Sequence, residues 1–223
     1  MRLPRKNGIK DILMSTKLTR WVLSMSLVIV GLATLALAEN TPASPDQGPV
    51  VGGVEMRTFV KPGSHFSCEV PRQWGIWIDA HHEEISKVYG VFLKKGPQGQ
   101  KGVPAMIGIN YFAKGNTTFK SEEQYVRRNT VPDPILPPLK GEKLSPIRKI
   151  TVAGREARTF DRDTFTYYPP KSMRTKEIPV KERTVVVPAQ EGFYVLFYEA
   201  PIAVFDQYAP VFDRVLQSFK PGH

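Results

Sequence analysis

The N-terminal segment is the feature that most constrains this chain. Residues 1–38 combine six basic side chains, an uncharged and mostly apolar run from Trp21, and the small-residue ending Ala36-Leu37-Ala38. This order is typical of a secretory signal peptide cleaved before Glu39. The run is also near the minimum length that spans a bilayer, so an uncleaved membrane anchor is the alternative. Both interpretations place the folded part outside the cytoplasm, in the periplasm or another extracytoplasmic space.

Length and cysteine content limit the mature chain to one ordinary domain. The full chain has 223 residues and a single cysteine, Cys68, which excludes a disulfide framework and a zinc site built on several thiolates. Residues 39–53 are rich in Pro, Gly, Ser and Asp and are predicted to be a flexible leader. The domain is therefore expected over residues 54–221.

The charge is concentrated in one stretch of the sequence. The formal net charge is +10, but residues 1–38 hold six basic residues and one acidic residue, so +5 remains after cleavage. Residues 140–183 contain twelve Lys or Arg against six Asp or Glu, and the rest of the mature chain is nearly neutral. We therefore predict an exported domain with one basic face. Export and the modest mature charge argue against a nucleic-acid partner.

Hydrophobic periodicity predicts an α+β fold, a layered domain with a mostly antiparallel sheet. One helix is expected at residues 121–130, with Ser121 as its cap. A C-terminal helix carries an apolar stripe from Val204 to Phe219 and packs on the sheet. Pro210 interrupts this stripe: it falls near the first turn if Asp206 caps the helix, and otherwise kinks it. The strands at 182–187 and 193–198 are expected to form a hairpin with its turn at 188–192. The other expected strands are 54–60, 65–70, 88–94, 105–112, 148–152 and 156–168.

No set of residues predicts catalysis, and no cofactor is expected. A nucleophile motif with a neighbouring base is missing from the sequence, and alternation points Cys68 into a strand, where burial keeps a thiol inert. Metal-type ligands gather only at residues 79–84. On a helical turn His81 and Glu84 would share a face, with His82 beside them and Trp74 and Trp77 nearby. A periplasmic metal or small-ligand site there is the alternative function.

The basic region suggests docking instead. Residues 167–176 combine tyrosines, prolines and cations in what is predicted to be an exposed loop, a composition suited to an acidic protein surface or anionic head groups. The candidate binding residues are Arg155, Arg158, Arg162, Tyr167, Tyr168, Lys171, Arg174 and Lys176.

Three segments resemble a known superfamily. They are Phe66-Ser67-Cys68-Glu69-Val70-Pro71-Arg72-Gln73-Trp74, the strand ending at residues 109–112, and the ending from residue 194 to 221 with Leu216-Gln217-Ser218-Phe219. This combination is similar to the PsbP-like superfamily of extracytoplasmic α-β-α sandwich domains, over residues 54–221. The resemblance implies the fold and a binding or accessory role in membrane-associated assemblies, and it carries no catalytic motif. The hypothesis is an exported, non-catalytic accessory domain that docks through residues 140–183 on a protein or membrane-associated complex.

Overall fold

The computed structural model describes residues 49–95, 102–131, 141–170, 172 and 174–222. The expected signal segment 1–38 and most of the expected leader lie outside the described residues. Within the described part, no helix is both long and apolar enough to cross a bilayer.

An eight-stranded sheet organises the described residues, and all of its pairings are antiparallel. The apolar strand that the sequence predicts at 193–198 lies at its centre, with β6 on one side and β10 on the other. Ala153 and Gly154, both with positive φ, form the tight turn between β8 and β9. In order across the sheet, the strands are β4 (Gly75–Trp77), β5 (Val88–Lys94), β6 (Met106–Ala113), β11 (Gly192–Pro201), β10 (Lys176–Ala189), β9 (Arg155–Tyr168) and β7 (Lys143–Leu144), and β8 (Arg148–Val152) also pairs with β9.

A smaller antiparallel sheet contains β1 (Val50–Val51), β2 (Val54–Val60), β3 (Phe66–Pro71) and β12 (Lys220–Pro221), in that order. The structure places β1 within the stretch predicted as leader. Its two residues pair with the start of β2, Val50 with Glu55 and Val51 with Val54.

Three helices are described: α2 (Ala80–Ser86), α3 (Glu122–Thr130) and α4 (Ile202–Ser218). Ser121 caps α3 as predicted, because its side chain accepts a hydrogen bond from the Gln124 amide. Helix α4 begins directly after β11, so Asp206 is not its cap and Pro210 lies inside the helix. Proline has no amide hydrogen, so the Asp206 carbonyl loses its regular donor.

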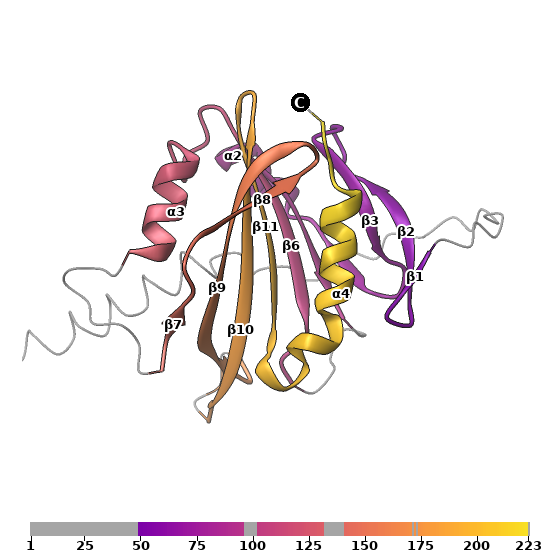
Figure 1. The fold of residues 1–223 in the computed structure, drawn as a ribbon, viewed down its shortest axis with the longest axis vertical. Coiled ribbons are helices and arrows are strands. Elements are labelled where there is room, and N and C mark those ends of the chain that lie inside the picture. Colours follow the sequence, from indigo (N-terminus) through magenta and orange to yellow (C-terminus); the bar gives the residue numbers. More distant parts are fainter. Residues whose placement is uncertain (1–48, 96–101, 132–140, 171, 173, 223) are drawn as a thin grey trace, which may run out of the picture. The chain divides into compact units, whose positions relative to one another are not determined.

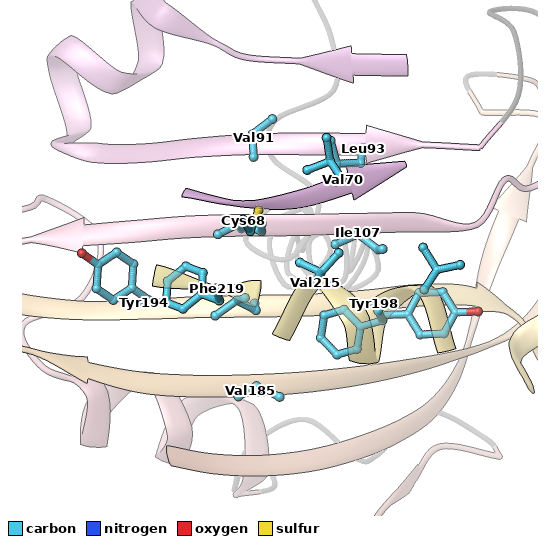
Figure 2. Packing of buried hydrophobic residues seen from close by; sticks show 14 of the residues in the cluster. Cys68, Val70, Val91, Leu93, Ile107, Val185, Tyr194, Tyr198, Val215 and Phe219 are labelled. Carbon is cyan, nitrogen blue, oxygen red and sulfur yellow. The ribbon is translucent and has the colours of Figure 1, made fainter. Parts of the chain in front are cut away.

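The main core lies between one face of the large sheet, the small sheet and α4. Figure 1 shows α4 (yellow) between the small sheet (indigo) and strands β6 and β11. In Figure 2, side chains from β3, including Cys68 and Val70, meet Ile107 and Tyr194 of the large sheet, with Val215 of α4 beside them. The predicted C-terminal helix packed on an antiparallel sheet is therefore confirmed.

Helix α3 covers the opposite face of the large sheet. A smaller apolar cluster lies beneath it, in which Phe112 stacks on Phe193 at 4.8 Å between ring centroids and Val126 enters from the helix. The layers are thus α3, the large sheet, and α4 with the small sheet. This arrangement is the predicted α+β sandwich.

The region between β9 and β10 differs from the sequence prediction. The predicted strand to Tyr168 is confirmed by β9, but Lys176, expected in the exposed loop 167–176, begins β10 six residues before the predicted strand at 182. Lys176 pairs with Tyr168, and Glu177 pairs with Tyr167. Pairing with the long β9 extends β10 into a stretch that has little strand character of its own.

Candidate functional site

The predicted binding residues are distributed along β9 rather than on one face. Arg155 is at the start of the strand and Tyr168 at its end, a separation of about 43 Å for an extended strand. Arg155 donates a hydrogen bond to the Pro188 carbonyl at 2.9 Å. The structure therefore does not bring Arg155 together with the residues at the far end of β9.

Two of the predicted arginines hold α3 on the sheet. Arg158 pairs with Glu122 and lies 3.4 Å from Glu123, both in the first turn of the helix. Arg162 donates to the Asn129 carbonyl at 2.6 Å, near the C-terminal end of the helix. These two guanidinium groups are used inside the fold and are poorly placed to contact a partner.

The other described candidates do come together. Tyr167, Tyr168, Arg174 and Lys176 lie at the end of the β9–β10 hairpin, and we call these four residues the tip cluster. The Tyr167 hydroxyl donates to the Glu177 carboxylate at 3.3 Å. Lys171 lies outside the described residues.

Exposed apolar side chains along the neighbouring β7–β8 segment were not found by the sequence reasoning. Leu144 is 39% exposed and Ile147 is 46% exposed, comparable with Tyr167 at 42%. In the sequence, Leu144 and Ile147 lie between two exposed cations, Lys143 and Arg148. We call Lys143, Leu144, Ile147 and Arg148 the edge patch. The signal was present as apolar residues beside cations in a proline-rich stretch.

The candidate metal turn forms part of α2. Asp79 caps the helix by accepting from the His82 amide at 3.0 Å, and His81 and Glu84 are exposed. Among the described residues, no three His, Cys, Asp or Glu side chains gather as a metal site would require. The metal or small-ligand alternative stays a prediction, which metal analysis of the purified protein and of a His81→Ala variant checks.

Glu83, which lies between His82 and Glu84 in the sequence, has a structural role. Glu83 accepts from the buried Lys61 ammonium at 3.0 Å and from the Gly90 amide at 2.9 Å. Trp74 is buried in the main core against Tyr208, at 6.0 Å between ring centroids. Both residues therefore link parts of the fold.

Cys68 is buried in β3, as predicted. Burial, with a smaller contribution from the adjacent Glu69 charge, raises the pKa of its thiol to about 12. The thiolate is the reactive form of cysteine, so Cys68 is unreactive near neutral pH.

A charged row crosses the large sheet on the face that carries α3. The strand register aligns Met106 of β6, Glu199 of β11, Glu182 of β10 and Arg162 of β9. We call these four residues the carboxylate row. Burial raises the pKa of Glu199 to about 7, the Glu182 carboxylate adds to this increase, and Arg162 opposes it. Sequence reasoning missed the pair because the two glutamates are seventeen residues apart and meet only through hairpin register.

An aromatic row lies beside the carboxylate row on the same sheet face. Trp77 packs on Phe92 at 5.4 Å and Phe92 packs on Phe197 at 6.0 Å between ring centroids. The Phe197 ring lies over Gly108, where an added Cβ would be only 2.1 Å from the ring. Glycine at this position allows the ring to lie against the sheet.

No family model matches the chain, and no curated protein matches it. Among solved structures, it is similar to cyanobacterial PsbP from Synechocystis, with 12% identity and a TM-score of 0.45 over 81% of this chain and 98% of that one.

Two further solved structures are similar to the chain. Protein PA94 of unknown function from Pseudomonas aeruginosa is 15% identical, with a TM-score of 0.41 over 74% of this chain and 96% of that one. LpqN from Mycobacterium tuberculosis, described as involved in cell envelope biogenesis, is 15% identical, with a TM-score of 0.41 over 74% of this chain and 90% of that one.

Proposed function

We propose that this protein is an exported accessory domain that docks, without catalysing a reaction, on an acidic surface of a partner protein. The docking surface is the tip cluster together with the edge patch. The observation that carries the proposal is the presence of exposed apolar side chains near Lys143, Arg174 and Lys176, three cations that form no ion pair with any described residue.

Ion pairing separates these cations from the others in residues 140–183. Arg158 and Arg162 contact α3, and Arg183 binds Asp161. In contrast, Lys143, Arg174 and Lys176 form no ion pair with any described residue. A carboxylate on a partner could therefore pair with them without breaking an existing contact.

The exposed apolar residues supply a contact surface for a partner protein, which charge alone does not. Leu144 lies opposite Arg162 on the α3 face of the sheet edge and Tyr167 on its other face, so a partner would cover these side chains and Ile147 by gripping the edge. Aromatic residues are enriched at the centres of protein interfaces. Cations around such a centre steer association and select acidic partners. This combination favours a protein surface over a purely electrostatic contact.

A pair of matched variants tests the proposal. One replaces Lys143, Arg174 and Lys176 by alanine, and the control replaces the exposed Lys120, Arg127 and Arg128 around α3. Both lose three positive charges, so a difference between them reports position and not net charge. Wild type and control are expected to recover the same acidic protein from envelope extract. The variant without Lys143, Arg174 and Lys176, which we call the tip variant, is expected to lose it.

Two further results complete the test. Binding should weaken as salt increases, because salt screens the attraction between the exposed charges of the two proteins. Equal recovery by the tip variant and the wild type would overturn the proposal. If the wild type bound anionic lipid vesicles but recovered no protein partner, the proposal would also be overturned. N-terminal sequencing of the exported protein checks cleavage before Glu39.

A further inference from the structure

The carboxylate row lies next to the arginine that holds one end of α3. We propose that the Glu182–Glu199 pair is a proton-operated latch for this helix. With a proton on the pair, Arg162 holds the C-terminal end of α3. When the proton leaves, Arg162 is drawn toward two adjacent carboxylates and the helix end is released. The latch does not depend on the docking function.

Helix α3 is held at both ends by the same strand. Arg158 contacts the first turn of α3, and Arg162 contacts Asn129 in its last turn. The two arginines are about 13 Å apart along an extended strand. The helix rises about 11 Å from Glu122 to Asn129. The matching lengths place α3 along β9, with one guanidinium group near each end.

Arg162 is bound less firmly to α3 than Arg158 is. It makes one short hydrogen bond to the Asn129 carbonyl and a longer one of 3.4 Å to the Asn129 side chain, and its Nε lies 3.8 Å from Glu142. Its direct cross-strand neighbour is Glu182. The same guanidinium can therefore be attracted either toward the helix or toward the carboxylate row.

The groups around the Glu182–Glu199 pair come from the neighbouring strands and from α3. Strand β10 contributes Glu182, whose carboxylate also accepts from the Thr184 hydroxyl at 2.9 Å, and β9 contributes Arg162. Helix α3 contributes Tyr125, a partly buried tyrosine whose pKa is raised by burial and by Glu182 and lowered by Arg162. Strand β6 contributes the uncharged Met106, and Lys94 lies beyond it on β5. The nearest cation to the pair in the row is Arg162.

The direction of the pH dependence follows from which state of α3, latched or released, binds the proton more tightly. With Arg162 turned toward Asn129, burial and the neighbouring Glu182 charge raise the pKa of Glu199 to about 7. Movement of the Arg162 guanidinium toward the pair brings a positive charge closer and lowers the pKa of Glu199 toward the ordinary value for glutamate, so the proton favours the latched state. The ratio of latched to released helix should therefore fall as pH rises from the ordinary glutamate pKa to about 7.

Hydrogen exchange of the α3 amides at residues 126–130 measures this ratio. After correction for the intrinsic pH dependence of exchange, their protection should fall roughly ten-fold between about pH 6 and pH 8. The uncharged Glu199→Gln side chain imitates the protonated carboxyl, so this variant should keep high protection at both pH values. Glu84→Gln on the exposed side of α2 is the control and should retain the wild-type dependence.

A measurement without substitution guards against a folding defect in the variant. The side-chain carboxyl carbon of Glu199 in the wild-type protein should titrate near neutral pH in an NMR experiment. Flat protection of α3 in the wild type would overturn the latch. The same pH dependence in Glu199→Gln, or an ordinary titration of the Glu199 carboxyl, would overturn it as well.

Discussion

The two faces of the large sheet are built from the same strands but are closed in different ways. Among the described residues, the face toward α4 belongs to one apolar cluster of 25 buried residues, which the small sheet and α4 cover. The face toward α3 has a cluster of eight and, beside it, the carboxylate row. Alternation in β10 shows the difference directly, because Val185 and Val187 enter the large cluster while Glu182 and Thr184 lie on the other face.

This difference indicates which face maintains the fold and which face can change. Opening the α4 face would expose a continuous apolar surface, at a free-energy cost comparable with global unfolding. Opening one end of α3 would expose little apolar surface and would hydrate charged groups. Chemistry and movement are therefore expected on the α3 face.

The largest expected effect comes from a cavity on the α4 face. Phe212→Ala removes a fully buried ring of α4 and should reduce the free energy of unfolding by about 3–5 kcal/mol. Phe119→Ala, in the smaller cluster under α3, should cost clearly less because its surroundings can collapse or admit water. Denaturant unfolding of both variants measures the difference, and equal costs would contradict the contrast between the faces.

The next effect depends on pH. Because the folded pKa of Glu199 is raised to about 7, its contribution to stability is complete below the unfolded pKa and is lost as pH rises to about 7. Glu199→Gln removes that loss, so at about pH 8 the variant should be more stable than wild type by roughly 2–3 kcal/mol. At about pH 4 the two proteins should be nearly equal. A variant less stable than wild type at the higher pH would contradict the burial of this carboxylate.

Local patterns were sufficient for much of the fold. Strands β2, β5 and β8 begin and end at the predicted residues, and the Ser121 cap of α3 was predicted correctly. The periodicity of side chains and the chemistry of helix caps are properties of neighbouring residues, so they can be read without a partner strand.

Hairpin register was beyond these patterns. The predicted turn at residues 188–192 would pair 187 with 193, but the actual turn is Gln190-Glu191 and pairs Val187 with Tyr194. A shift of one residue changes every cross-strand pair. It places Glu182 opposite Glu199 instead of Tyr198, so the carboxylate row could not be predicted without the correct turn.

The charge count that predicts a basic face is incomplete for a related reason. A count of charges over residues 140–183 does not distinguish cations that pair within the fold from those that do not. Arg158 and Arg162 alternate with Asp161 along β9 and so lie on the opposite face from it. Pairing partners on α3 and β10, which are distant in sequence, decide which cations remain for a partner.

A medium effect is expected on the α4 side of β9. Burial alone would raise the pKa of Asp161, but the hydrogen bond and charge of Arg183, with the charges of Lys181 and Arg148, hold it below the ordinary value. Asp161→Asn should therefore cost about 1–2 kcal/mol at neutral pH. A depressed pKa contributes stability above the unfolded pKa, so the cost should disappear in acid. Unfolding at both pH values tests this, and a cost that persists in acid would indicate lost packing instead.

The smallest effect belongs to an exposed pair at the edge of the same sheet. Lys149 and Glu156 are 2.9 Å apart, but their side chains are 74% and 67% exposed. Water and salt screen such a pair, and holding two long side chains in one geometry costs entropy, so Lys149→Ala should change stability by less than about 0.5 kcal/mol. The Arg183–Asp161 pair has a similar shortest distance of 3.0 Å, but it is less exposed, has two hydrogen bonds and has Lys181 beside it. A cost as large as that of Asp161→Asn, measured under the same conditions, would mean that contact distance and not burial determines the strength of charge pairs on this sheet.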